Sequence, residues 1–151
     1  MDIYCCECQN DVQARLTNGA EIYPHRSDLA ELPFWKCDTC GNYVGTHHKT
    51  TNHTAPLGVI PTPEIRKARY HIHKLLDKLW GNGRMSRTTA YKLISERCGW
   101  NYHTAKIRSI EEAREIYRIV QSLFDTDEYR MGIEPAGPDE GDGWHWITGN
   151  D

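Results

Sequence analysis

The chain has 151 residues, a mean hydropathy of −0.71 and a net charge of −3. This length suits one domain or two small modules, and the polar composition argues against a large single hydrophobic core. No run approaches the ~20 apolar residues of a membrane-spanning helix, and the acidic, cysteine-rich N-terminus lacks the charged-then-apolar pattern of a signal peptide. We therefore expect a cytoplasmic protein without a membrane partner.

The small net charge conceals a strong asymmetry along the chain. Residues 66–108 contain eleven Lys or Arg and two acids, a net of +9. Residues 125–151 contain eight acids and one Arg, a net of −7. A basic middle followed by an acidic end favours a charged partner, either nucleic acid or an acidic protein surface.

Residues 1–60 are predicted to form short strands and turns. The run VQARL at 12–16 alternates apolar and polar residues, as a half-buried strand does. Asn18-Gly19 follows it and predicts a hairpin turn, because both residues tolerate positive φ. LPFWKC is the second strand candidate, GNYVGTHH continues after it, and the polar stretch 46–58 predicts a loop.

Two Cys-x-x-Cys pairs, Cys5/Cys8 and Cys37/Cys40, predict one four-thiolate metal site. The two-residue spacing lets both sulfurs of a tight turn face one ion. Cys6 is placed outside the site, because its one-residue spacing from Cys8 cannot form the same knuckle. Metal is favoured over disulfides in a reducing compartment, and zinc is favoured over mononuclear iron. A four-thiolate site is closed, so we expect one structural Zn²⁺ that takes no part in catalysis.

Residues 61–124 are predicted to form three helices. The first begins with Pro63 at its first position and ends at the Gly-Asn-Gly turn at 81–83. Ser86 caps the second helix, and the capping box at 109–112 begins the third. The first and third helices carry these apolar stripes at helical spacing: Ile65, Ala68, Ile72, Leu75, Leu76, Leu79, and then Ala113, Ile116, Tyr117, Val120, Leu123, Phe124.

The predicted fold class is therefore α+β, with three parts. A zinc ribbon of short β-hairpins and two knuckles occupies 1–60, a three-helix module with a basic surface occupies 61–124, and an acidic, flexible tail occupies 125–151.

Several motifs together carry a resemblance to a known family. They are Tyr4-Cys5-x-x-Cys8, the run EIYPHR-x-DL at 21–29, Phe34-x-x-Cys37-x-x-Cys40-Gly41-x-x-Val44-Gly45 and Pro56-Leu57-Gly58. In these motifs, and in its helices to about Val120, the chain resembles zinc-finger-containing proteins of unassigned function that occur in bacteriophages and other mobile elements. The resemblance implies zinc ligation at the four paired cysteines, supplies no established activity and does not reach the tail. For a phage protein, the expected location is the host cytoplasm.

The basic segment makes nucleic-acid binding without catalysis the leading hypothesis. Lys and Arg neutralise phosphates, and the break between the first two helices loosely resembles a helix-turn-helix. An ordinary solvated helix face is the alternative interpretation. Arg84 and Arg87 are the first choices for phosphate contact, because a helix N-terminus favours anions. The full set of candidate contacts is Arg66, Lys67, Arg69, Lys74, Arg84 and Arg87.

Other functions stay open. The protein is alternatively a binder or modulator of a host protein, with the acidic tail as a nucleic-acid mimic. A second alternative is a small metal-dependent nuclease that uses His25, or the loop histidines His47, His48 and His53, as ligands or bases. No carboxylate pattern accompanies them, so exposed loop histidines are the favoured interpretation and enzymatic activity is not expected. His25 and Arg26 form a candidate anion-contact turn, for which a packed turn is the favoured alternative.

Overall fold

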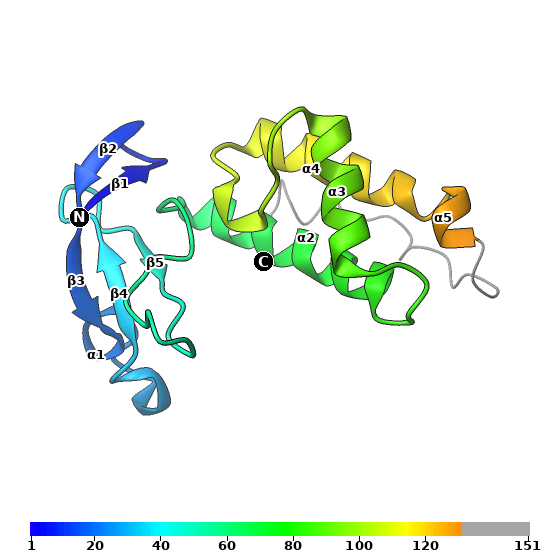
Figure 1. Ribbon diagram of the computed structural model, residues 1–151. Coiled ribbons are helices and arrows are strands. Elements are labelled where there is room, and N and C mark those ends of the chain that lie inside the picture. The colour runs from blue at the N-terminus through cyan, green and yellow to red at the C-terminus, as the bar shows by residue number, and fades with distance from the viewer. Residues whose placement is uncertain (131–151) are drawn as a thin grey trace. The chain divides into compact units, whose positions relative to one another are not determined.

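The computed structural model describes residues 1–130 and separates the chain into two compact units, the first at 1–63 and the second from residue 64 onward (Figure 1). The first unit is built of short antiparallel strands and the second of helices, which confirms the predicted α+β class. Most of the predicted tail, 131–151, lies outside the described residues. Within residues 1–130, no helix is both long enough and apolar enough to cross a bilayer.

Short strands in the first unit form two antiparallel sheets. One sheet pairs β1 with β2, and the other has the order β3-β4-β5. Their bounds are β1 (Asp2–Cys5), β2 (Asn10–Gln13), β3 (Arg15–Asn18), β4 (Pro33–Lys36) and β5 (Tyr43–Gly45). The predicted strand at 12–16 is divided between β2 and β3, with buried Ala14 between them. The chain therefore leaves one sheet and enters the other at this alanine.

Asn18-Gly19 begins a helix, so the predicted hairpin turn is wrong. The side-chain oxygen of Asn18 accepts a hydrogen bond from the backbone N–H of Glu21 at 3.3 Å and caps the short helix α1 (Gly19–Ile22). An ideal Cβ on Gly19 would lie 1.7 Å from the carbonyl oxygen of Leu29. Glycine is needed here because the backbone of the following segment approaches so closely. That segment includes the 3₁₀ turn η1 (Ser27–Leu29).

The hydrophobic core of the first unit is small. Its buried members are Ile3, Cys5, Ala14, Cys37, Val44 and Ile60. Ile60 ties the end of the predicted loop back to β1, because its N–H donates to the Tyr4 carbonyl at 2.8 Å and its carbonyl accepts from the Cys6 N–H at 2.9 Å. Two of the six core residues are cysteines of the predicted site. The fold of this unit therefore depends on the chemistry at those sulfurs.

The second unit contains the predicted helices and two shorter elements. Their bounds are α2 (Pro63–Trp80), α3 (Arg87–Cys98), η2 (Thr104–Lys106), α4 (Ile110–Leu123) and α5 (Asp127–Arg130). The hydroxyl oxygens of Ser86 and Ser109 accept hydrogen bonds from the N–H groups of Thr89 and Glu112, each at 3.1 Å, which confirms both predicted caps. All residues of the two predicted apolar stripes are buried, and α3 packs against α4 (Figure 1).

The helical unit extends past the predicted boundary at 124. The Tyr129 side chain on α5 is fully buried, and its ring centroid lies 5.0 Å from that of Phe124. Its hydroxyl accepts a hydrogen bond from the Asn82 side-chain amide at 2.9 Å, and the Arg84 guanidinium carbon lies 5.4 Å from its ring centroid. Residues 125–130 therefore belong to the packed unit.

Candidate metal centre

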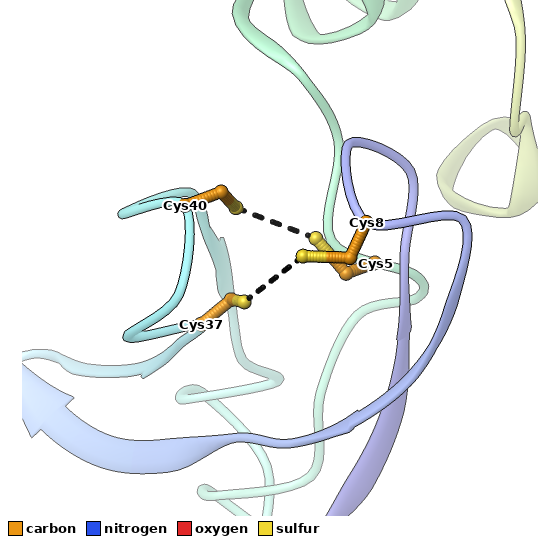
Figure 2. A group of neighbouring side chains, drawn as sticks. All are labelled: Cys5, Cys8, Cys37 and Cys40. Carbon is orange, nitrogen blue, oxygen red and sulfur yellow. Dashed lines mark hydrogen bonds between the residues drawn. The ribbon is translucent and has the colours of Figure 1, made fainter.

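Four cysteine sulfurs converge in the first unit. The Sγ atoms of Cys5, Cys8, Cys37 and Cys40 all lie within 4.8 Å of one another. Figure 2 shows them pointing toward a common centre, with 3.5 Å between the sulfurs of Cys5 and Cys40 and 3.7 Å between those of Cys8 and Cys37. Zinc–sulfur bonds of about 2.3 Å in a tetrahedron place the sulfurs about 3.8 Å apart. The cluster therefore has the size and donor set of a four-thiolate zinc site.

Each pair of ligands sits on the turn of a β-hairpin. In the first pair, Cys5 ends β1 and Cys8 lies in the turn before β2, where the Gln9 N–H donates to the Cys5 carbonyl at 2.8 Å. The second pair lies between β4 and β5, where the Gly41 N–H donates to the Cys37 carbonyl at 2.7 Å. Gln9 and Gly41 both have positive φ, 58° and 85°. The same backbone bend after each second cysteine turns the two sulfurs of a pair toward one point.

The thiols hold their protons with different strengths when no cation is present. Burial, with hydrogen bonds from neighbouring cysteines, raises the pKa of Cys8 to about 12. Burial also raises the pKa of Cys40 to about 11. Burial opposes ionisation of Cys37 as well, but the backbone N–H groups of Cys40 and Thr39 stabilise its thiolate and lower its pKa to about 7. A bound cation must therefore displace protons from at least two of the four sulfurs.

A family model described as a zinc-finger-containing domain matches residues 2–125, which include both hairpin turns and α2, α3 and α4. The chain belongs to this family of zinc-finger-containing domains. No curated protein and no solved structure matches the chain. The family and the sulfur geometry agree, so the four cysteines are positioned to bind one zinc ion.

Cys6 lies outside the zinc finger's ligand set, as the spacing predicted. Its side chain is buried, but it is not a member of the group of sulfurs that converge. Its N–H donates to the Ile60 carbonyl at 2.9 Å. Cys6 therefore belongs to the backbone connection between β1 and the end of the first unit.

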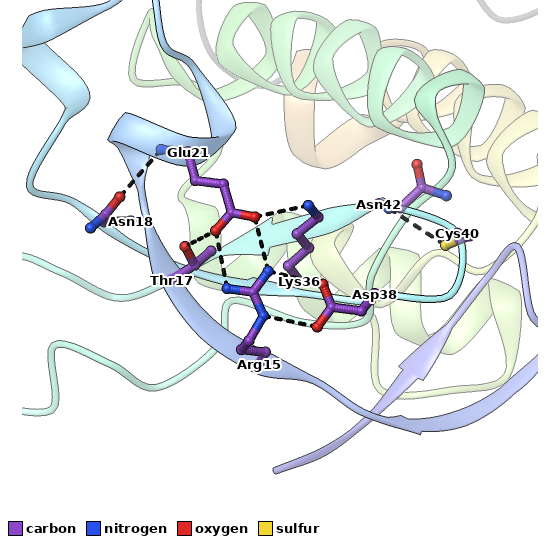
Figure 3. Close-up of polar contacts among 8 residues, drawn as sticks. All are labelled: Arg15, Thr17, Asn18, Glu21, Lys36, Asp38, Cys40 and Asn42. Atoms are coloured by element: carbon purple, nitrogen blue, oxygen red, sulfur yellow. Dashed lines mark hydrogen bonds and ion pairs between the residues drawn. The ribbon is translucent and has the colours of Figure 1, made fainter.

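A network of charged side chains links the zinc finger's second hairpin turn to β3 and α1 (Figure 3). The Arg15 guanidinium donates to both carboxylate oxygens of Asp38, at 2.8 and 2.9 Å, and to both of Glu21, at 3.1 and 2.9 Å. Glu21 also accepts from Lys36 at 2.9 Å and from the Thr17 hydroxyl. Hydrogen bonds from Arg15 lower the pKa of Glu21 and of Asp38 below their usual values.

This network positions the second pair of ligands. Asp38 follows Cys37 directly, so its two bonds to Arg15 hold the turn that carries Cys37 and Cys40 against β3. The sequence motif at 21–29 includes Glu21, but nothing in the spacing of residues 15, 21 and 38 indicated that the three side chains meet. Their proximity follows from the register in which Arg15 on β3 is opposite Lys36 on β4.

The candidate histidines do not form a second metal centre. His47, His48 and His53 are all exposed, and within residues 1–130 the four cysteines are the one group of ligand-type side chains close enough to hold an ion. The side chains of the predicted turn divide: Tyr23 packs on aromatic neighbours, whereas His25 and Arg26 are exposed. Arg26 donates to both carboxylate oxygens of Asp28, at 2.9 and 2.7 Å, so its charge is already compensated.

The six basic candidates have different surroundings. Arg69 donates to the Ile107 carbonyl at 2.7 Å and joins α2 to the segment before α4. Arg84 is half-buried over the Tyr129 ring. Arg66 and Lys67 are half-buried as well, whereas Lys74 and Arg87 are exposed. Exposure therefore makes Lys74 and Arg87 the most accessible members of the predicted set.

Proposed function

We propose that this zinc-finger protein is a non-enzymatic binding module whose helical unit docks nucleic acid. The observation that carries the proposal is the charge of residues 66–108, where eleven Lys or Arg stand against two acids. Lysines and arginines that neutralise phosphates release counterions, and this release drives nucleic-acid binding. Because the cysteine motifs resemble those of phage and mobile-element proteins, the proposal includes that a phage or another mobile element encodes the protein.

The zinc site supports a structural role and no catalytic one. Its four thiolates complete a tetrahedron, which leaves no coordination position for a water molecule or a substrate. In this proposal zinc stabilises the small first unit, and the helical second unit binds the nucleic acid. Lys74 and Arg87 are the leading phosphate contacts, because Arg69 and Arg84 are engaged in packing.

Fluorescence anisotropy with labelled single strands and duplexes tests this proposal. Affinity is expected to fall steeply between about 50 and 200 mM salt, as it does where cations contact phosphates. The double variant Lys74→Gln/Arg87→Gln should weaken binding and make the logarithmic salt dependence shallower by about one to two.

A matched control removes the same amount of charge elsewhere. Arg26 and Arg130 are exposed and already paired with Asp28 and Asp125, at 2.7 and 3.0 Å. The variant Arg26→Gln/Arg130→Gln should therefore bind as the unaltered protein does. Absence of binding, or binding that salt does not change, would overturn the proposal. An equal loss in the control variant would show that the effect follows net charge, and would contradict phosphate contact by Lys74 and Arg87.

A further inference from the structure

A continuous row of rings connects α2, α3 and the segment after α3. Its members are His73, Trp80, Tyr91, His103, Tyr102 and Trp100. The ring centroids of Trp80 and Tyr91 are 5.7 Å apart, and those of Tyr91 and His103 are 5.5 Å apart. Side chains far apart in the sequence thus form one aromatic array.

Hydrophobic packing accounts for only part of this row. Tyr102 is 1 % exposed, and its hydroxyl lies 2.7 Å from that of Thr104, so this ring belongs to the core. Trp80 and Tyr91 are only half-buried, and His103 is exposed. Partial burial is common for Trp, Tyr and His, but here three partly or fully exposed rings lie together in one array. Trp80, Tyr91 and His103 therefore leave aromatic surface accessible to solvent.

Positive charge accompanies the half-buried rings. The Arg87 guanidinium carbon lies 4.9 Å from the Trp80 ring centroid, in the first turn of α3, where the helix dipole also favours anions. At the other end of the row, the Asp77 carboxylate lies 3.5 Å from the His73 ring nitrogen. Cations next to stacked aromatic rings are the combination with which proteins bind unpaired nucleotides.

We propose that Trp80, Tyr91 and His103 form a stacking site for the unpaired bases of single-stranded nucleic acid, with Arg87 contacting the adjoining phosphate. The inference rests on the proposed function and narrows its partner to a single strand. A duplex hides the faces of its bases inside its own stack, so these rings reach base faces only in an unpaired strand. Ring stacking tolerates any base, so the site distinguishes strand state and not sequence.

Three probes of equal length separate stacking from phosphate contact. They are a single strand of about 12 nucleotides, an abasic strand with the same number of phosphates, and a duplex. The ordinary strand is expected to bind about 10- to 100-fold more tightly than the abasic strand at equal salt. DNA and RNA versions of the ordinary strand show which of the two nucleic acids binds more tightly.

Substitution of Tyr91 then assigns the effect to the row. Tyr91→Leu should remove most of the preference for the ordinary strand over the abasic one and leave abasic binding unchanged. Tyr70→Leu is the control, because Tyr70 is 58 % exposed on the same helix as Trp80 and its ring neighbours are His71 and the Lys74 ammonium, 5.4 Å from its centroid. Any effect through Lys74 should be equal for the ordinary and abasic strands. Equal zinc content and equal helical circular dichroism show that each variant is folded.

Tryptophan fluorescence provides a second measurement of stacking, which does not depend on weakening the binding. Bases stacked on Trp80 should quench its fluorescence, and the abasic strand should not. Trp80→Phe should abolish this part of the quenching while binding persists, because phenylalanine still stacks. Salt-dependent binding that is equal for ordinary and abasic strands would overturn the stacking site and leave the proposed function intact. Failure of every probe to bind would instead overturn the proposed function.

Discussion

Cysteine residues in the first unit have two different roles. Cys5, Cys8, Cys37 and Cys40 bring their sulfurs together on two hairpin turns, whereas buried Cys6 contributes backbone and volume. Serine in place of a ligand removes a thiolate that zinc requires, but serine in place of Cys6 retains all four. The consequence of each substitution can therefore be measured as bound metal.

We expect the Cys37→Ser variant to lose stoichiometric zinc and the Cys6→Ser variant to retain one equivalent. Native mass spectrometry, with a colorimetric zinc assay after thiol modification, measures both. Retention of a full equivalent by Cys37→Ser would contradict the assigned ligand set. Loss of zinc from Cys6→Ser alone would show that the adjacent cysteine replaces Cys5 or Cys8.

Zinc affinity should fall as the pH falls. The pKa values of about 12 for Cys8 and about 11 for Cys40 mean that both thiols are protonated at neutral pH without a cation, so zinc must displace their protons. Each displaced proton changes the apparent affinity by up to about tenfold per pH unit. Competition with a zinc chelator of known pH dependence, at pH values from about 6 to 8, measures the change. An affinity that does not depend on pH would contradict the assigned protonation.

The ion-pair network should slow zinc loss. Arg15→Gln removes the bonds that hold Asp38, so zinc transfer to a chelator is expected to be faster than in the Arg26→Gln control, whose ion pair reaches no cysteine. Lowering the pH should also speed zinc transfer to the chelator. Because the pKa values of Glu21 and Asp38 are lowered in the fold, their stabilising contribution is present above their unfolded values near 4 and is lost as the pH falls. Equal transfer rates in the two variants would contradict a role for Arg15.

Among the elements of the first unit, α1 depends on the absence of one side chain. Gly19→Ala would place a Cβ 1.7 Å from the Leu29 carbonyl oxygen, and a backbone atom cannot move aside as a flexible side chain can. We expect this variant to lower the free energy of unfolding by about 1–3 kcal/mol. Gly45→Ala, whose nearest neighbour is the end of the Leu57 side chain at 3.4 Å, should change it by less than about 0.5 kcal/mol. Thermal unfolding at saturating zinc compares the two, and equal losses would contradict this explanation.

Elements defined by local signals could be predicted from the sequence. The starts of α3 and α4 follow from Ser86 and Ser109, whose hydroxyls bond within the next turn, and the buried faces follow from helical spacing. The helix that begins at Asn18-Gly19 could not be predicted in this way. Gly19 is required by the close approach of Leu29, ten residues further along the chain, and the hairpin turns are made by the cysteine pairs instead. Spacing alone identified all four zinc ligands, since the knuckle geometry is local.

Basic side chains on the helices could be found from sequence, but not their surroundings. Arg69 bonds to the carbonyl of Ile107, and Arg84 packs on Tyr129, so both depend on contacts between segments far apart in the chain. The Arg15 network has the same origin, because three elements must fold before its side chains meet. Long-range partners of polar side chains leave no periodic pattern in the sequence.

At the scale of the whole molecule, the two units should respond differently to metal removal. The first has a core of six small or medium residues that includes two zinc ligands, whereas the second buries the apolar faces of α2, α3 and α4 without metal. A structural zinc site supplies on the order of 10–16 kcal/mol of apparent folding energy. A strong chelator should therefore unfold residues 1–63 and leave most of the far-ultraviolet circular dichroism of the helices. Hydrogen exchange shows which residues lose their structure. Unfolding of the helices at the same chelator concentration would contradict independent stability of the two units.

Deletion of 131–151 tests whether the acidic end competes with nucleic acid. This segment contains five acids and no Lys or Arg. If it occupies the basic surface, the truncated protein should bind strands more tightly, by a factor that shrinks as salt rises. Unchanged affinity at low salt would contradict competition. Loss of a host-protein partner on the same deletion would instead support the role as a nucleic-acid mimic.

The buried ring at Tyr129 determines where that deletion can begin. The matched family region ends at residue 125, and a protein shortened to that length would lose α5 and uncover Phe124. It would also take away the acceptor of the Asn82 amide and the ring beneath Arg84. Such a protein would fail through exposed apolar surface, and poor expression or aggregation would be mistaken for an effect of the acids. A shortened protein suitable for crystallisation or binding work should therefore end after Arg130.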